Sequence, residues 1–272
     1  MAALLNNVKA SSEESSGRSR GTWARNGGQA TGILEWTTAT PEALRPYLAV
    51  IAERIPVDKK RSEEACTLKI DGLFVQGRRT AIVYRCSQQP ATLREVLLNI
   101  GKPSGDDRRI LAGIIATQVR SLHVHFQLQH MAMRTESFVF FGHAKRPDLT
   151  KPYILDWSRR SSPDMYQHPQ YRVDKPLWFY QIWSLLMVLS EIAEWRPLDG
   201  EFRDKGQLLR RQQARRRLVT SPDWKGAATA ELFKYGFDFL DRDRSTLEKC
   251  NHWDVKRFYD GFCELLARPL KR

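Results

Sequence analysis

The side chains with the greatest chemical capacity fall into three groups along this 272-residue chain. Three histidines, His123, His125 and His130, precede a short apolar run, and Ser137 stands directly before that run. Asp156 follows a second apolar run, where it either holds a cation or closes a strand end through hydrogen bonds. The third group consists of arginines, whose guanidinium forks match phosphate and carboxylate: Arg210, Arg211, Arg215, Arg216 and Arg217.

The spacing of these groups does not indicate a metal site. The histidines have no Cys or carboxylate nearby to complete a ligand set, and the four cysteines are widely spaced without a C-x-x-C pair. We therefore interpret the cysteines as buried thiols of a reducing compartment. Neither a signal peptide nor an apolar run long enough for a membrane span is evident. We expect a cytoplasmic or nuclear location and no transmembrane segment.

The composition indicates a folded and strongly basic protein. Hydrophobic residues make up 42% of the chain, enough for one large domain or two small lobes. The formal net charge is +13. A positive surface attracts nucleic acid, anionic membranes or acidic proteins, but it does not specify a fold. Solubility and non-specific adhesion are the simpler interpretation of this charge.

The first third of the chain predicts a disordered tail followed by a small helix-plus-sheet unit. Residues 1–30 are rich in Ser, Gly, Asn, Arg and Glu, and they have too little apolar surface to offset the entropy of ordering. Order is expected over residues 31–88. Thr40 before Pro41 is a good helix cap with proline at the first helical position. The expected elements are a strand at 32–37, a helix at 41–55, and strands at 66–70, 73–75 and 80–84.

Residues 89–272 predict a mainly helical unit, which makes the fold class α+β. The segment 177–195 is apolar on nearly all sides, which is typical of a helix at the buried centre of a domain. Asp106 or Asp107 is expected to cap a long helix that precedes it. The other expected elements are a short helix at 93–97, strands at 138–141 and 153–155, helices at 228–240 and 253–266, and a basic insertion near 204–222.

Several motifs occur together in the order found in protein kinases. The segment HMAMRTES (130–137) before FVFF has the frame of the catalytic loop H-R-D-x-x-x-x-N. The segments SLH (121–123), DWS (156–158) and YQHP (166–169) stand where kinases have the end of a long helix, D-F-G and the end of the activation segment. The chain thus resembles a degenerate protein kinase-like fold. Its SEIAEWRPL run (190–198) is similar to fungal kinase-like domains that follow HeLo-type prion-inhibition-and-propagation domains.

The resemblance implies a bilobal fold, with a reduced N-lobe of one small antiparallel sheet and one helix, and a helical C-lobe. It implies that His130 braces the catalytic loop from inside. Ala132 stands in place of the catalytic aspartate, and Ser137 in place of the metal-binding asparagine. Glu35 stands near the slot of the strand lysine, and no phosphate-covering G-x-G-x-x-G is present. Only Asp156 is in register as a magnesium ligand.

These losses predict a catalytically inactive pseudokinase that serves as a binding or regulatory module, with a protein partner and no cofactor. The resemblance alone implies its context, which is fungal signalling or non-self recognition. The first alternative is an atypical or weakly active kinase that binds Mg-ATP through Asp156. The second is a nucleic-acid- or anion-binding protein that uses the five arginines, with a steep salt dependence. A solvated insertion is the simpler interpretation of that arginine-rich segment.

Overall fold

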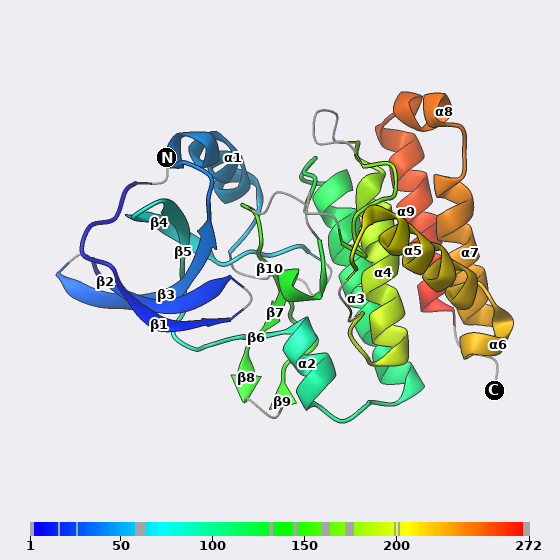
Figure 1. Cartoon of the computed structure of the whole chain (residues 1–272), viewed down its shortest axis with the longest axis horizontal. Coiled ribbons are helices and arrows are strands. Elements are labelled where there is room, and N and C mark those ends of the chain that lie inside the picture. Colours follow the sequence, from blue (N-terminus) through cyan, green and yellow to red (C-terminus); the bar gives the residue numbers. More distant parts are fainter. Residues whose placement is uncertain are drawn as a thin grey trace.

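The computed structural model describes residues 3–15, 17–25, 27–57, 64–130, 133–143, 146–158, 164–171, 177–198, 200 and 202–268. Figure 1 shows an antiparallel sheet in the N-terminal part of the chain and a group of helices in the C-terminal part. The protein is therefore mixed α+β, and the fold class expected from the sequence is confirmed at this level.

Five strands form the main sheet, and each is antiparallel to its neighbours in the order β1-β2-β3-β5-β4. The expected strands at 32–37 and 80–84 lie within β3 and β5. The two segments expected at 66–70 and 73–75 form one strand, β4, which begins at Lys69 and has an irregular register between Ile70 and Gly72. The bounds of the five strands are β1 (Lys9–Ser15), β2 (Arg18–Arg25), β3 (Gly28–Thr37), β4 (Lys69–Gln76) and β5 (Arg79–Arg85).

The prediction of a disordered tail over residues 1–30 is wrong, because this segment supplies β1, β2 and the start of β3. β2 pairs with β3 along its whole length, beginning with Arg18 opposite Glu35. Trp23 anchors the strand, with only 1% of its surface exposed. A strand added to an existing sheet satisfies its backbone through its neighbour and can manage with one large apolar anchor. Composition alone overlooks that possibility.

Helix α1 (Pro41–Arg54) has nearly the predicted bounds, for the predicted reason. The side chain of Thr40 accepts a hydrogen bond from the N–H of Ala43, and Pro41 occupies the first turn. The buried face of the helix carries Leu44, Leu48 and Ile51, and the helix packs against β4.

Short strands connect the sheet to the helices. A three-stranded sheet has the order β10-β7-β6, and a separate pair of strands joins β8 to β9. The strands expected at 138–141 and 153–155 are β7 and β10, which pair antiparallel. The bounds are β6 (Ala91–Thr92), β7 (Phe138–Phe140), β8 (Gly142–His143), β9 (Arg146–Pro147) and β10 (Tyr153–Ile154).

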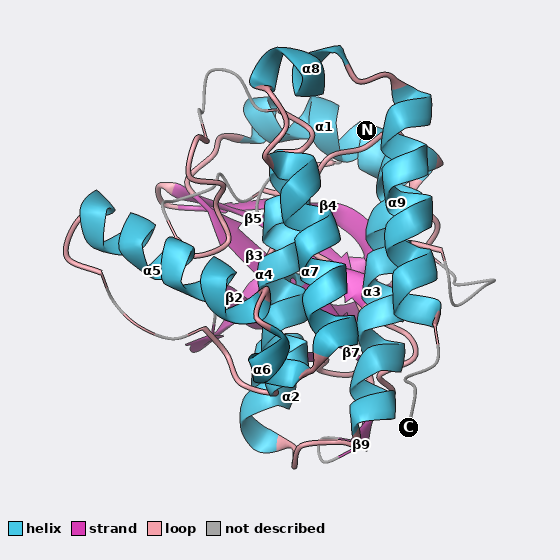
Figure 2. Cartoon of the chain, turned by 90° about the vertical axis from the view of Figure 1, so that its right-hand side faces the viewer, coloured by secondary structure: helices cyan, strands magenta, loops and turns pink. Residues whose placement is uncertain are grey.

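The C-terminal part is built around α4, in which every residue from Tyr180 to Ile192 is buried. The predicted apolar central helix is thus confirmed. In Figure 2, α4 and α7 run beside α3 and α9, and α5 lies across one flank. The bounds are α2 (Leu93–Asn99), α3 (Gly105–Val124), α4 (Tyr180–Glu194), α5 (Lys205–Val219), α6 (Pro222–Lys225), α7 (Ala227–Leu240), α8 (Arg244–Lys249) and α9 (His252–Ala267).

The cap of α3 differs from the expectation. Ser104, and not Asp106 or Asp107, precedes the helix, and its side chain accepts a hydrogen bond from the N–H of Asp107 at 3.1 Å. The two aspartates lie instead in the first turn, where a negative charge is favourable beside the positive end of the helix dipole.

One large hydrophobic core runs from the inner face of the sheet, at Ile33, Ile82 and Tyr84, into the helices around α4. A second, smaller core lies elsewhere on the sheet and is formed by Trp23, Leu34, Ala81 and Val83. The sheet and the helices therefore share a continuous apolar interior. Within the described part of the chain, no helix is long and apolar enough to span a membrane.

Candidate functional site

A buried cluster of charged side chains forms where the sheet meets the helical part. The N–H of Leu155 donates to the carbonyl of Ser137 at 2.8 Å, because β7 and β10 pair side by side. This contact places the next residue, Asp156, beside Ser137. Pairing of β2 with β3 sets Arg18 opposite Glu35, so both side chains project from one face of the sheet. We call the following six polar residues the Asp156 cluster: Arg18, Glu35, Arg134, Ser137, Asp156 and Ser158.

Asp156 lies at the centre of this cluster and is 4% exposed. Its Oδ1 is 2.5 Å from Nη2 of Arg18, and its Oδ2 accepts a hydrogen bond from Ser137 Oγ at 2.9 Å. Nε of Arg134 lies 3.6 Å from the same Oδ2. Both carboxylate oxygens of Asp156 are therefore engaged. The backbone at this residue is left-handed, with φ of 66°, a conformation that Asp tolerates better than most residues.

Glu35 fixes the backbone that follows β10. Its Oε2 accepts the N–H of Asp156 at 2.8 Å, and its Oε1 accepts the hydroxyl of Ser158 at 2.9 Å. A strand residue of the sheet thus holds the turn that presents Asp156. The sequence placed Glu35 near a position where a cation is expected; here its carboxylate acts as a backbone clamp.

Arg18 supplies the cation of the cluster. Its Nη1 donates to the carbonyl of Glu136 at 2.8 Å, while its Nε lies 3.9 Å from Oε2 of Glu35. The side chain is only 8% exposed. Arg18 therefore links β2 both to Asp156 and to the segment before β7.

The two buried carboxyl groups have opposite pKa shifts. Burial alone would raise the pKa of Asp156, but the positive charges of Arg18 and Arg134 outweigh it and hold that pKa below its usual range. Burial, together with the charge of Asp156, raises the pKa of Glu35. The pKa of Arg18 is raised despite its burial, because both carboxylates stabilise its charge. Asp156 is accordingly the charged partner of Arg18.

His130 is buried and connects α4 to the residue before Asp156. Its backbone N–H donates to Oε1 of Gln181 on α4 at 2.7 Å, and its Nε2 lies 2.6 Å from the carbonyl of Leu155. Its ring also packs on Trp157, with 4.8 Å between centroids. Burial lowers the pKa of His130, which favours the neutral ring. The contacts of this histidine thus position the residue before Asp156.

Of the residues in the HMAMRTES segment (130–137), the structure brings His130 and Ser137 to the Asp156 cluster. Ala132, the residue expected in place of a catalytic aspartate, lies outside the described residues, as does Met131. Ser137 does reach Asp156, and it does so as a hydrogen-bond donor.

Two other histidines, His123 and His168, pack against aromatic rings. His123 lies 5.3 Å from the ring of Trp178, and burial lowers its pKa to about 4. His168 stacks on Tyr180, consistent with the packing role expected of the YQHP segment. Among the described residues, no three His, Cys, Asp or Glu side chains lie close enough to hold a metal ion.

The surroundings of Asp156 do not fit Mg-ATP. A cleft of about 580 Å³ opens beside it, but its lining includes the carboxylates of Glu14, Glu35 and Asp156. The guanidinium of Arg79, in the same cleft, is held by Glu14 at 2.8 and 2.9 Å. Metal-bound phosphates need free carboxylate oxygens and an available cation, whereas Arg18 and Asp156 neutralise each other.

The arginine-rich segment forms α5, and its arginines do not act as one surface. Arg215 is buried: it donates to the Ser190 hydroxyl at 3.0 Å and pairs with Glu194. Its prediction as an anion-binding residue is therefore wrong, because its charge already serves the α4–α5 contact. Arg216 pairs with Asp241, and the remaining arginines, Arg210, Arg211 and Arg217, are exposed or half-buried.

Two contributors to the site were missed from the sequence. Arg18 lies in the segment predicted to be disordered, and its run RSRGTWAR has no alternation of apolar and polar residues that would indicate a strand. Arg134 was treated only as part of the catalytic-loop frame. A search of protein-family models found no match to the chain, and a search of curated proteins likewise found none.

Proposed function

We propose that this protein is a degenerate kinase-like domain that acts as a binding or regulatory module and does not transfer phosphate. Under this proposal, the sheet with α1 is a reduced N-lobe that begins at β1, and the helices from α3 onward form the C-lobe. The succession of β7, β10, Asp156 and the buried helix α4, with His130 bracing the turn, supports the kinase-like interpretation.

The observation that carries the proposal is the ion pair between Arg18 and Asp156. Phosphoryl transfer depends on positioning and on neutralising phosphate charge, since the protein supplies little covalent chemistry. Asp156 is the one carboxylate in register to hold magnesium, and its two oxygens are bound by Arg18 and Ser137. A metal would have to displace a buried guanidinium from its partner, which is costly.

The two alternatives have less support. Weak Mg-ATP binding through Asp156 would have to overcome the same ion pair and the acidic lining of the neighbouring cleft. Nucleic-acid binding through α5 would have to work without Arg215, which is buried. We therefore retain a protein as the proposed partner of the module.

Nucleotide binding by the full chain tests the proposal. A ligand at one hundred times its Kd stabilises a protein by about 2.7 kcal/mol, which shifts Tm by several degrees. We expect no shift and no titration heat with Mg-ATP at millimolar concentration, and no phosphate transfer to the chain or to a generic substrate. Mn-ATP should give the same result, because the obstacle is the Arg18–Asp156 pair.

A control variant gives this experiment a clear alternative outcome. Asp156→Asn keeps the shape of the side chain and an acceptor for Ser137, but it removes the charge that a metal would need. Metal-dependent stabilisation by ATP that the wild type shows and Asp156→Asn loses would replace the proposal with the weakly active kinase.

A further inference from the structure

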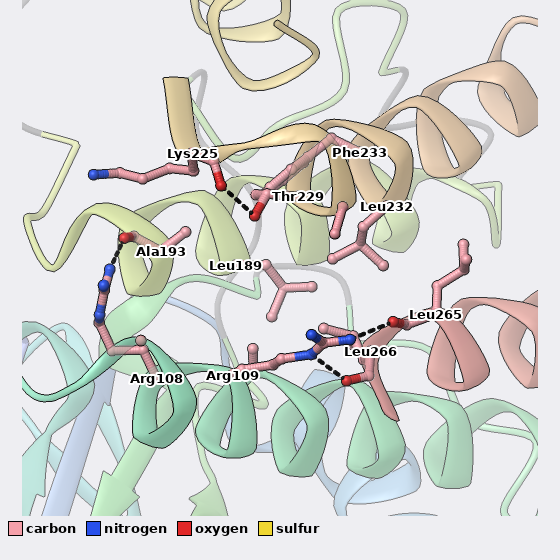
Figure 3. Close-up of a pocket in the computed structure, with 13 residues that line it drawn as sticks. Arg108, Arg109, Leu189, Ala193, Lys225, Thr229, Leu232, Phe233, Leu265 and Leu266 are labelled. Carbon is pink, nitrogen blue, oxygen red and sulfur yellow. Dashed lines mark hydrogen bonds between the residues drawn. The ribbon is translucent and has the colours of Figure 1, made fainter. Parts of the chain in front are cut away.

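An apolar pocket lies between α3, α4, α7 and α9, far in sequence from Arg18 (Figure 3). Its volume is about 150 Å³, and its walls include Leu189, Leu232, Phe233 and Leu266. A cavity of about this volume with Leu, Ile and Phe walls is large enough to hold a benzene molecule. The interior therefore suits an apolar body of one ring or of a short branched chain.

Arg109 puts a positive charge in the wall of this pocket. Its Nε donates to the carbonyl of Leu266 at 2.6 Å, and its Nη2 donates to the carbonyl of Leu265 at 2.9 Å (Figure 3). Its Nη1 is buried and has no hydrogen-bond partner among the described residues. This half-buried guanidinium is held only by neutral carbonyls and has no counter-ion among the described residues that line the pocket, and a partly desolvated charge is favourable only when it is paired.

Two further cations line the pocket, Arg108 on α3 and Lys225 on α6. Nη1 of Arg108 donates to the carbonyl of Ala193, another neutral partner. Burial lowers the pKa of Arg108. The pKa of the neighbouring Lys102 is also lowered, by desolvation and by the charges of Lys225 and Arg108. Positive charge therefore accumulates at this pocket.

No carboxylate occurs among the described residues that line the pocket. Glu194, at the end of α4, pairs with Arg215, and Glu231 on α7 pairs with Arg268. Asp106 and Asp107 lie outside the lining, in the first turn of α3, where they offset the positive end of that helix dipole. The first turn of α7 lines the pocket and carries no acidic residue, so the positive end of its dipole adds to the positive field.

We propose that this pocket binds a small apolar monocarboxylate. The apolar body, about the size of a benzene ring, fills the space beside Leu189 and Phe233, and the carboxylate supplies the counter-charge for Nη1 of Arg109. Arg108 and Lys225 lie on the other side of the pocket (Figure 3) and add to its positive field. None of these residues belongs to the Asp156 cluster, so this site does not depend on the kinase-like interpretation.

Calorimetric titration of the full chain with three probes tests the site. Phenylacetate carries both the ring and the charge, 2-phenylethanol carries the ring alone, and acetate carries the charge alone. One charge-assisted hydrogen bond in a dry site accounts for about a ten-fold change in Kd. We expect phenylacetate to bind at least about ten-fold more tightly than either of the other probes.

Four variants assign the binding to this pocket. Arg109→Gln should weaken phenylacetate about ten-fold, and Lys225→Gln, at an exposed position that does not endanger folding, about three-fold. Ala112→Leu should abolish binding, because the larger side chain occupies the apolar space. Arg120→Gln is the matched control: Arg120 also joins α3 to α9, through Asp260, but it does not line the pocket.

Two results would overturn the proposal. One is equal binding, or no binding, of phenylacetate and 2-phenylethanol by the wild type. The other is an unchanged Kd for phenylacetate in both Lys225→Gln and Ala112→Leu, with circular dichroism showing that both variants are folded. If Arg109→Gln does not fold, these two variants still decide the question.

Discussion

At the scale of single residues, Glu191 is a buried carboxyl group whose pKa lies well above its usual value. It is fully buried in α4, where its Oε1 accepts the hydroxyl of Tyr166 at 2.8 Å and the N–H of Leu198 at 2.6 Å. Its Oε2 has no hydrogen-bond partner among the described residues. Burial raises the pKa of Glu191 to about 8, so the folded protein keeps this group protonated at neutral pH.

This shift predicts a pH-dependent cost to stability. The unfolded chain loses the proton near pH 4.5, whereas the folded chain keeps it up to about pH 8. Between these values the native state binds more protons, so Glu191 lowers the free energy of unfolding as pH rises. Glu191→Gln should therefore gain stability relative to wild type from pH 5 to pH 8, by up to about 1.4 kcal/mol per pH unit. Urea denaturation measures the difference; a pH-independent difference would contradict it.

The sequence predicts well the position of residues that depends on their neighbours along the chain. It predicts poorly the position of residues that depends on the register in which two strands pair. His130 precedes β7 and Asp156 follows β10, and the sequence motifs around them predicted that both residues lie beside these two strands. Arg18 meets Asp156 only because β2 pairs with β3 in one particular register. A one-residue slip would turn Arg18 to the other face, and nothing within its own segment reveals that register.

At the scale of elements, β2 shows how a polar segment becomes part of a folded sheet. Trp23 packs with Leu34 and Val83 in the smaller core, and its Nε1 donates to the buried carboxylate of Asp71 at 3.2 Å. Arg25, at the end of β2, pairs with the same carboxylate. One tryptophan and one ion pair thus tie the N-terminal hairpin to β4.

Replacing two tryptophans tests whether the segment around Trp23 is a strand of the folded sheet or a disordered tail. Trp23→Ala should lower the free energy of unfolding by about 3–5 kcal/mol, since it empties a buried site. Trp253→Ala is the matched control, because that side chain is 68% exposed, and it should cost less than about 0.5 kcal/mol. Chemical denaturation of both variants measures the contrast. Similar small losses would restore the disordered-tail prediction for residues 1–30.

Helices were predicted better than strands for a physical reason. The residues that set a helix boundary lie next to it in the sequence, as Thr40 and Pro41 do for α1. The buried helix α4 is evident from its continuous apolar sequence. Strands β1 and β2 are stable only through their partners, so their own sequence is insufficient. In α5, local reasoning found the helix but could not tell that Arg215 faces Ser190 while Arg217 remains exposed.

At the scale of the whole molecule, the Asp156 cluster is one of several links between sheet and helices. The hydroxyl of Tyr47 on α1 donates to the carbonyl of Gln129 at 3.0 Å. The hydroxyl of Thr67 donates to the carbonyl of Ile154 at 2.9 Å. Arg54 on α1 also donates to the carbonyl of Phe126 at 3.1 Å, at an exposed position. Because Arg18 is the cation among these links that pairs with a buried carboxylate, its removal affects the joint most strongly.

A charge-removal series tests that joint. Arg18→Met leaves two buried carboxyl groups without their cation and should lower the free energy of unfolding by about 3–5 kcal/mol. The triple variant Arg18→Met, Glu35→Gln, Asp156→Asn removes all three charges and should lose at least about 1 kcal/mol less. Guanidinium denaturation of both proteins makes the comparison. A triple variant less stable than Arg18→Met would contradict an electrostatic role for Arg18.

The continuity of the large core has a thermodynamic consequence. We expect a sheet and helices that share one interior to unfold in one cooperative transition. A ligand that binds one element then raises the free energy of unfolding of all of them. A carboxylate bound at the pocket between α3 and α7 would stabilise β2 by the same RT ln(1 + [L]/Kd) as α9. Strand β2 lies at the opposite end of the fold from α7 and α9 (Figure 1), so Trp23 in β2 would then report occupancy of the pocket through the unfolding midpoint of the sheet.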